Sequence, residues 1–365
     1  MGGMERVVCE LLASSKDFLF CTDSEGQLYE GALAQAKICV GRQARLLVVD
    51  WVVVWKLVRF IHAHKIECLH AHNHVAHLYA VLASVLTRVP VVVTLHGQGY
   101  FDTPRTLKLR RWLSRLTRVV VVVSKDVGDV VVKSGAVPRE KIKIIPNGVD
   151  TISFSPSPFR GDGWSEGVAP VCIGSIGRLA SEKNYPLLIR AFAVLEKAKE
   201  LKEAGSPRPT PRLLLIGDGS ERGAIEALIR EFGLEKQCTL AGMQTDVLPW
   251  LHQMDLFCLS SDTEGLSMTL LEACACGLPC VVTDVGGNAE IVADGISGFV
   301  VPRGDVNALS VALTRLMADA ELRRQMGQAA RRIVEEKFSL AAMVEGYEQV
   351  YADIVAAAAA KWWLS

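Results

Sequence analysis

Short apolar runs alternate with amphipathic stretches along most of the chain. The run Val119–Val123 is all valine, and Val91–Leu95 begins with three valines. Such runs are typical of strands buried on both faces of a parallel sheet. Around them, Val75–Leu86 and Arg105–Leu116 repeat apolar positions at helical spacing. Strands that alternate with helices predict an α/β fold with doubly wound sheets.

The alternation of strands and helices occurs twice. A segment rich in Ser, Pro and Gly, residues 153–170, interrupts it, and the pattern restarts at the strand Val171–Ile176. We therefore expect two domains, over residues 1–155 and 156–339, followed by a final helix over residues 340–360. Further predicted elements include the helix Glu25–Gln35 and the strand Ile66–His70.

Composition narrows the functional classes. The chain has 365 residues, with 40 Lys and Arg against 40 Asp and Glu, so its net charge of zero argues against a nucleic-acid-binding protein. Ten cysteines without framework spacing predict reduced thiols and a cytoplasmic location. The most apolar run, Leu46–Phe60, contains charged residues and is too short to span a bilayer.

Two stretches leave a membrane-surface role open. Trp51 and Trp55 could touch a bilayer, although a helix packed on a sheet is the favoured interpretation of their segment. The helix Arg105–Leu116 carries a basic face, for which a solvated surface is favoured over contact with an anionic membrane or a lipid-linked acceptor.

The segment 260–292 predicts a binding site for an anion. An apolar strand is followed by a turn at Glu264-Gly265 and by a helix over Ser267–Cys276. A helix start after a strand presents backbone N–H groups and the positive end of the helix dipole. Glu264 and Glu272 bracket this helix start, so phosphates and hydroxyl groups can both be bound, and a nucleotide-sugar carries both.

Several short motifs follow one another along the chain. They are Gly2-Gly3 with Glu5-Arg6, Pro146 to Asp150, Gly177-Arg178-Leu179 with Glu182-Lys183-Asn184, Gly217-Asp218-Gly219, Glu264 to Glu272 and Gly286-Gly287. As a set, and in this order over nearly the whole chain, they resemble glycosyltransferase family 4, and the set is specific although each motif alone is weak.

The resemblance implies the GT-B fold, in which two Rossmann-like domains face each other across a cleft. It also implies retaining sugar transfer and a C-terminal helix that packs back on the first domain. Members of the family carry a strand before the Gly2-Gly3 turn, whereas this sequence begins at the turn. The first N-terminal strand is therefore expected to be missing, and a truncated sequence is favoured over an impaired domain.

Donor chemistry assigns roles to several residues. The chain has no convincing Asp-x-Asp motif, so we expect no metal cofactor, and Arg178 and Lys183 would offset the charge on the diphosphate leaving group. The resemblance implies that Glu264 faces the donor sugar and that Glu272 binds the ribose hydroxyls. The other residues predicted to bind the donor are Gly2, Gly3, Gly177, Asp218, Gly265, Leu266, Ser267, Met268 and Thr269.

Histidines mark the end of two predicted strands. His96 follows the strand Val91–Leu95, and the resemblance supports contact with the sugar or the reacting centre. His70, His72, His74 and His77 could suggest zinc. The resemblance favours a strand end of the family's H-x-H-N type instead, at which His72 or Asn73 could line the acceptor site.

The sequence thus predicts a glycosyltransferase that moves a sugar from a UDP- or GDP-linked donor to a glycan or lipid-linked acceptor. A peripheral position at the inner face of a membrane is compatible with this prediction. Two alternatives remain open: a catalytically impaired nucleotide-sugar-binding protein, and a sugar-nucleotide epimerase of the same fold.

Overall fold

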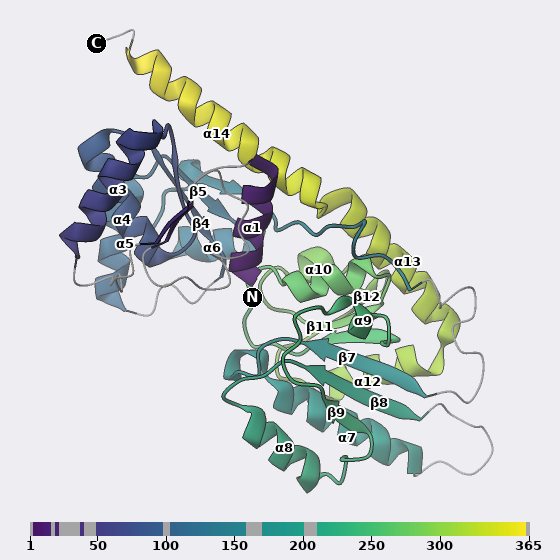
Figure 1. Cartoon of the computed structure of the whole chain (residues 1–365). Coiled ribbons are helices and arrows are strands. Elements are labelled where there is room, and N and C mark those ends of the chain that lie inside the picture. Colours follow the sequence, from purple (N-terminus) through teal and green to yellow (C-terminus); the bar gives the residue numbers. More distant parts are fainter. Residues whose placement is uncertain are drawn as a thin grey trace. The chain divides into compact units, whose positions relative to one another are not determined.

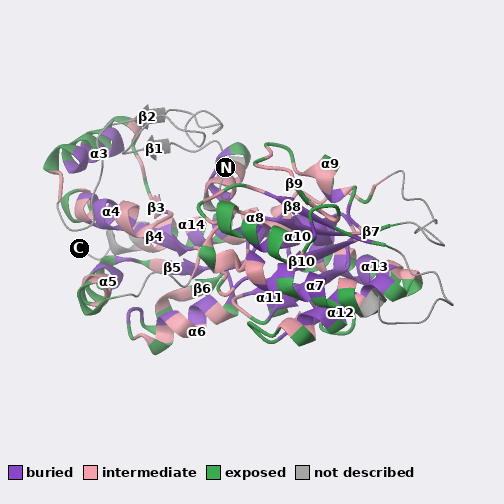
Figure 2. Ribbon diagram, turned by 90° about the horizontal axis from the view of Figure 1, so that it is seen from below, coloured by how far each residue is buried: buried purple, intermediate pink, exposed green. Residues whose placement is uncertain are grey.

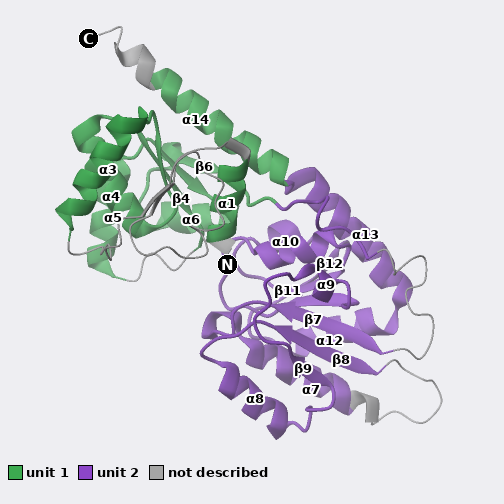
Figure 3. Ribbon diagram, viewed as in Figure 1, with its two compact units in different colours: residues 1–148, 340–365 green, residues 149–339 purple. Residues whose placement is uncertain are grey.

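The chain forms two compact units in a computed structural model, which describes residues 3–15, 19–21, 37–39, 49–97, 103–157, 170–200 and 210–362. Unit 1 comprises residues 1–148 and 340–365, and unit 2 comprises residues 149–339 (Figure 3). Unit 2 begins at Val149, because Val149 forms a bridge with Ser339 and its N–H donates to the carbonyl of Phe338 at 2.9 Å.

Unit 1 contains two separate parallel sheets. One sheet pairs two short strands, and the other has four strands in the order β3-β4-β5-β6. The strands are β1 (Leu19–Cys21), β2 (Lys37–Cys39), β3 (Leu69–Ala71), β4 (Val91–Leu95), β5 (Val119–Val122) and β6 (Ile142–Ile144). Strands β4 and β5 are buried almost throughout, as their valine runs predict.

Four helices of unit 1 begin at a side chain that caps them. Asp50, Asn73, Thr103 and Ser124 each accept a hydrogen bond from a backbone N–H in the first turn of the helix that follows. The helices are α1 (Gly3–Ser15), α3 (Trp51–His64), α4 (His74–Thr87), α5 (Pro104–Leu116), α6 (Lys125–Lys133) and the C-terminal α14 (Leu340–Trp362).

Unit 2 is built on one parallel sheet of six strands in the order β12-β11-β10-β7-β8-β9. The chain therefore fills one half of the sheet from β7 outward and then returns to the other side of β7 to add β10. The strands are β7 (Val171–Ile176), β8 (Pro211–Ile216), β9 (Cys238–Leu240), β10 (Leu256–Leu259), β11 (Cys280–Thr283) and β12 (Gly298–Val301).

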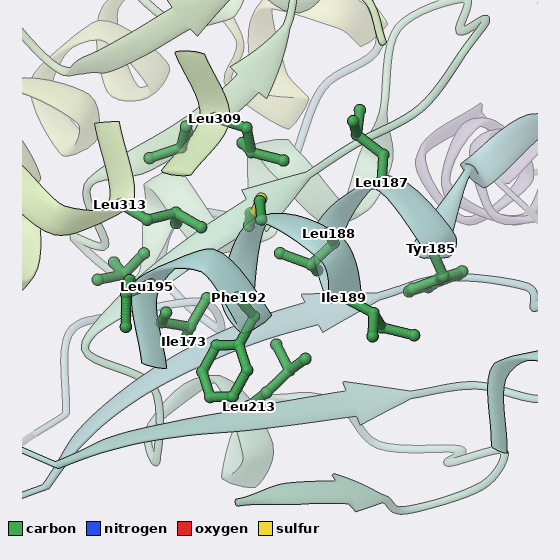
Figure 4. Packing of buried hydrophobic residues seen from close by; sticks show 14 of the residues in the cluster. Ile173, Tyr185, Leu187, Leu188, Ile189, Phe192, Leu195, Leu213, Leu309 and Leu313 are labelled. Atoms are coloured by element: carbon green, nitrogen blue, oxygen red, sulfur yellow. The ribbon is translucent and has the colours of Figure 1, made fainter. Parts of the chain in front are cut away.

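Helices cover this sheet and bury a large apolar core (Figures 2 and 4). Phe192 and Leu188 of α7 pack in the same cluster as Ile173 and Leu213 of the central strands, and all four are fully buried or nearly so. The helices are α7 (Tyr185–Glu200), α8 (Arg222–Glu231), α9 (Leu248–Leu251), α10 (Met268–Ala275), α11 (Asn288–Ile291), α12 (Val306–Ala318) and α13 (Ala320–Lys337).

The structure corrects some predicted elements. The strand expected at Ile66–His70 runs over Leu69–Ala71 instead, because the chain leaves α3 through Lys65 in the left-handed conformation before it enters the sheet. Helix α6 and strand β12 were not predicted from the sequence. The expected helix Glu25–Gln35 lies outside the described residues, as does most of the predicted linker.

In the part of the chain that the structure describes, no helix combines the length and the apolar character that crossing a bilayer requires.

Candidate active site

The candidate site lies where the strand order of unit 2 reverses. Strands β7 and β10 are parallel neighbours, although β8 and β9 come between them in sequence. In open parallel sheets, ligands bind beyond the carboxyl ends of the strands at such a reversal. Here the loop after β7 carries Arg178 and Lys183, and the loop after β10 carries Glu264.

Lys183 and Glu264 form an ion pair between these two loops. The Nζ atom of Lys183 lies 2.5 Å from Oε1 of Glu264, and the two side chains are 20% and 9% exposed. The hydroxyl of Ser261 also donates to Oε1 of Glu264, at 2.6 Å. The predicted phosphate-binding cation and the predicted sugar-binding carboxylate are therefore held together, with little access to water.

Arg178 is held differently from Lys183. Its guanidinium pairs with Glu182 at 2.5 Å, but its side chain is 73% exposed. Exposed pairs of this kind contribute little to stability because water screens them. Arg178 is thus free to exchange its partner for an anionic ligand at small cost.

The loops after β7 and β8 interlock at a glycine. Gly217 has a φ of +137°, and a Cβ atom at this position would lie 1.9 Å from the carbonyl oxygen of Gly177. The N–H of Leu179 donates to the carbonyl of Asp218 at 2.9 Å. The structure therefore brings together the predicted donor-binding residues Gly177, Arg178 and Asp218.

Helix α10 begins directly after the Glu264 loop. Ser267 caps it by accepting a hydrogen bond from the N–H of Leu270. Met268 and Thr269 occupy the first turn, whose N–H groups have no acceptor inside the helix. Gly265 and Leu266 are buried just before this turn. The backbone of the predicted anion-binding site is therefore fixed in place.

A second glycine packs against the backbone of the Glu264 loop. Gly286 has a φ of +57°, and a Cβ atom there would lie 2.3 Å from the carbonyl oxygen of Glu264. The N–H of Gly287 donates to the carbonyl of Gly265 at 2.7 Å. The Gly-Gly turn after β11 thus supports the backbone that carries Glu264.

Glu272 lies in the second turn of α10 and is fully buried. Its carboxylate is therefore shielded from bulk water. A carboxylate in such an environment accepts hydrogen bonds more strongly than one in water. Contact with ribose remains a prediction for this residue.

Two neighbouring groups complete the site. Asp262 accepts hydrogen bonds from Asn184 at 3.1 Å and from Arg303 at 3.0 Å, so a third cation lies at the edge of the Glu264 loop.

Tyr185 donates its hydroxyl to the carbonyl of Gly177. Burial raises the pKa of Tyr185 well above its usual value, so the phenol stays neutral and acts as a donor.

The remaining predicted residues belong to unit 1. His96 follows β4, and its Nε2 lies 3.1 Å from Nδ1 of His72. Burial lowers the pKa of His96 to about 4, so its ring is neutral near pH 7. Gly3 is the first residue of α1, and Gly2 lies outside the described residues.

Metal and thiol chemistry find little support in the described part of the chain. There, no group of three or more His, Cys, Asp or Glu residues is placed to hold a metal ion. The cysteines whose side chains the structure describes are free thiols, and Cys274, Cys276 and Cys280 are buried as core residues. His77 and His70 hydrogen-bond to hydroxyl groups of threonine and tyrosine.

Sequence reasoning missed Ser261, Asp262 and Arg303. Asp262 lies in the predicted turn and Ser261 directly before it, so their position just after β10 was a usable signal. Arg303 follows β12, 41 residues from Asp262, and nothing in its local sequence indicates this contact.

Family models match both halves of the chain. The model described as Glycosyltransferase Family 4 matches residues 1–152, and the model described as Glycosyl transferases group 1 matches residues 167–333. Together they include the Lys183–Glu264 pair, helix α10 and the strand end at His96. The chain belongs to glycosyltransferase family 4. It is thus a glycosyltransferase, as its motifs predicted.

Named relatives of this family 4 enzyme resemble it over most of their length. It is 29% identical to the N-acetyl-alpha-D-glucosaminyl L-malate synthase of Bacillus anthracis, over 84% of this chain and 80% of the relative. It is also 29% identical to the UDP-Gal:alpha-D-GlcNAc-diphosphoundecaprenol alpha-1,3-galactosyltransferase of Escherichia coli, over 85% of this chain and 81% of the relative.

Solved structures confirm the predicted GT-B fold of the family 4 enzyme. The Anabaena protein HepE, crystallised in complex with UDP, superposes with a TM-score of 0.81 at 21% identity and covers 96% of each chain. At this level of identity the likeness establishes the fold alone.

Proposed function

We propose that the enzyme transfers a sugar with retention from a UDP- or GDP-linked donor, without a metal ion, to a glycan or a lipid-linked acceptor. The observation that carries this proposal is the Lys183–Glu264 pair beside the N-terminus of α10. It places a cation, a carboxylate and helix N–H groups at the strand-order reversal, where a diphosphate and a sugar are to be bound together.

The reaction follows from these groups. The bond between the anomeric carbon and the diphosphate oxygen breaks, and its electron pair stays on the diphosphate. Lys183, Arg178 and the first turn of α10 offset that charge. The acceptor oxygen bonds to the anomeric carbon on the same face, and its proton passes to the departing phosphate oxygen, so no protein base is required.

Glu264 and His96 have different tasks in this proposal. Glu264 exchanges part of its contact with Lys183 for hydroxyl groups of the sugar once the diphosphate attracts that lysine. His96, a neutral imidazole, hydrogen-bonds to the sugar or the acceptor. The relatives' names include UDP-linked galactose as a donor, which supports a nucleotide-sugar here.

Unit 1 favours an acceptor at a membrane surface. Helix α3 leaves Trp51 and Trp55 63% and 64% exposed, although its opposite face is buried. Helix α4 packs between α3 and α5, and Figure 2 shows exposed surface on both outer helices. Seven large apolar side chains are exposed on these three helices: Trp51, Val52, Trp55, Val85, Leu86, Trp112 and Leu116.

Charge makes an anionic bilayer the partner that fits this face. Residues 49–97 and 103–118 contain ten Lys and Arg residues but only two acidic residues, Asp50 and Glu67, although the whole chain is neutral. Tryptophan and basic side chains together are typical of surfaces that bind anionic lipid headgroups. The names of the two relatives contain L-malate and a sugar linked to diphosphoundecaprenol. Of these two kinds of acceptor, this surface favours the lipid-linked one.

Turnover tests the proposal. The enzyme is incubated in EDTA with UDP-glucose, UDP-N-acetylglucosamine or GDP-mannose and lipid-linked acceptors, and released nucleoside diphosphate is measured. We expect release from at least one donor, with a product whose anomeric configuration by NMR matches that of the donor. Binding without release would favour a binding protein, and an altered sugar without acceptor would favour an epimerase.

A further inference from the structure

Three histidines lie together at the carboxyl ends of β3 and β4, two neighbouring parallel strands of unit 1. The rings of His70 and His72 are in contact, with centroids 3.9 Å apart, and those of His72 and His96 are stacked at 5.4 Å. Nδ1 of His72 and Nε2 of His96 form a hydrogen bond of 3.1 Å. His72 therefore lies between the other two rings and contacts both.

The first ring of this row is fixed by two hydroxyl groups. Nδ1 of His70 lies 2.6 Å from the hydroxyl of Tyr351, and its Nε2 lies 2.7 Å from the hydroxyl of Thr94. Tyr351 belongs to the C-terminal helix α14, 281 residues from His70 in sequence. With both nitrogens bonded, His70 cannot rotate without losing two hydrogen bonds.

All three rings are neutral near pH 7. Burial lowers the pKa of His70 to about 3 and holds that of His72 well below its usual value, and the neighbouring histidines add to both effects. Two neutral imidazoles can place only one proton in the hydrogen bond that joins them. The tautomer of His72 therefore determines the tautomer of His96.

The tautomer of His96 decides what its other nitrogen offers. Nδ1 of His96 is buried and has no hydrogen-bond partner among the described residues. If Nε2 of His96 donates to His72, Nδ1 is an acceptor for a hydroxyl group; if Nε2 accepts, Nδ1 is a donor.

We propose that His72 is a positioning residue that fixes the tautomer and orientation of His96, and that Tyr351 of α14 holds this arrangement through His70. The inference rests on the proposed function, in which His96 contacts the sugar or the acceptor. It assigns the C-terminal helix a part in the geometry of the reacting centre, beyond its packing on unit 1.

A pair of substitutions at position 72 separates the hydrogen bond from packing. In His72→Asn the side-chain amide can occupy the place of Nδ1, whereas His72→Leu offers no polar atom. Turnover, the KM for the donor and the ring ¹⁵N NMR signals of His96 are measured for both. We expect His72→Leu to lower kcat about tenfold to a hundredfold, as losses of ligand-orienting hydrogen bonds do, with the donor KM nearly unchanged and a mixed tautomer at His96. His72→Asn should restore most of the rate.

Two tyrosines of α14 provide the matched test of the distant contact. Tyr347 donates to or accepts from Thr94 at 3.1 Å and does not hydrogen-bond to His70, so Tyr347→Phe removes a buried hydroxyl from the same helix. We expect Tyr351→Phe to change the ring signals of His70 and His96 and to lower kcat. Tyr347→Phe leaves both hydrogen bonds of His70 in place and removes only the bond from Tyr347 to Thr94, so its effects should be clearly smaller.

Two results would overturn the inference. One is wild-type turnover and wild-type His96 signals in His72→Leu; the other is equal losses in the two tyrosine variants, which would indicate packing alone. The NMR signals do not depend on activity. Failure of the proposed function, seen as no nucleoside diphosphate release by the wild-type enzyme, is therefore distinguishable from failure of this inference.

Discussion

Lys183 and Glu264 are 81 residues apart in sequence, yet their charged atoms lie 2.5 Å apart across the loops after β7 and β10. The strand order brings these loops together, since β10 pairs with β7 and not with the strand before it in the chain. The pair prearranges a cation and a carboxylate for a ligand that carries both a diphosphate and hydroxyl groups.

Removal of the lysine charge should affect both stability and turnover. In Lys183→Met the mostly buried Glu264 loses its counter-ion, and we expect a loss of about 2 kcal/mol or more in the free energy of unfolding. Turnover with the nucleotide-sugar should fall at least about a hundredfold, because the leaving group loses a fixed cation. Urea titration and steady-state kinetics measure the two effects.

Arg178→Met is the matched control for that variant. The Arg178–Glu182 pair is exposed, so its loss should cost less than about 1 kcal/mol of stability, while turnover still decreases. Wild-type turnover in Lys183→Met would remove this lysine from the donor site.

The turn after β11 should not accept a side chain at Gly286. In Gly286→Ala the new Cβ atom meets the carbonyl of Glu264, so the Glu264 loop must shift and nucleotide affinity should fall. Gly295 also has a positive φ, +72°, but has open space around it. Gly295→Ala should therefore lower the free energy of unfolding by only about 1–2 kcal/mol, the cost of a left-handed backbone for a residue with a Cβ atom. It should bind UDP or GDP normally in calorimetric titrations.

The exposed tryptophans of α3 should contribute to vesicle binding. We expect the enzyme to co-sediment with phosphatidylglycerol vesicles and not with phosphatidylcholine vesicles, and to be released by salt, which screens the basic face. A Trp51→Ser, Trp55→Ser double variant should bind at least about tenfold more weakly, because two interfacial aromatic side chains are lost.

Met243→Ser provides the control, since Met243 is 73% exposed in unit 2 and its replacement should leave vesicle binding unchanged. If the wild-type protein does not bind anionic vesicles, or if it self-associates through the exposed face of α3, α4 and α5, the membrane proposal is wrong.

Buried neutral histidines should make the protein less stable in mild acid. Burial lowers the pKa of His77 to about 4 from 6.5. Between pH 6.5 and 4, His77 is therefore protonated in the unfolded chain but still neutral in the folded chain. Stability is therefore complete above about pH 6.5 and is lost as the pH falls towards 4. His70 and His96 act in the same direction.

The contribution of His77 can be measured separately. His77→Gln keeps a nitrogen near Nε2 for the bond to Thr117 and should reduce the slope of unfolding free energy against pH by up to about 1.4 kcal/mol per pH unit between pH 6 and 5.

The sequence predicted the elements with strong patterns and missed those whose pattern is ambiguous. Valine runs identified β4 and β5 because strands buried on both faces need no polar alternation. Helix α6 was missed because it contains Gly128 and three consecutive valines, residues with low helix propensity; burial of Val127 and Val131 stabilises it instead.

The candidate site was predicted as a set of residues but not as a set of contacts. Motif spacing placed Lys183 and Glu264 at strand ends, yet their pairing depends on the strand order. The contact between Tyr351 and His70 depends on where α14 returns to unit 1. Neither arrangement has a signal in the local sequence, because both arise from tertiary packing.

Nucleotide binding to Glu272→Gln tests the central claim most directly. The substitution keeps the shape of a fully buried side chain in α10 and removes its charge. UDP and GDP are titrated calorimetrically, in EDTA, into wild type and variant, with circular dichroism as the control for folding. We predict that the wild type binds one of the two and that the variant binds it about tenfold to a hundredfold more weakly, which corresponds to the loss of hydrogen bonds to a charged acceptor. Equal affinity in a folded variant, or no nucleotide binding by the wild type, would contradict the account.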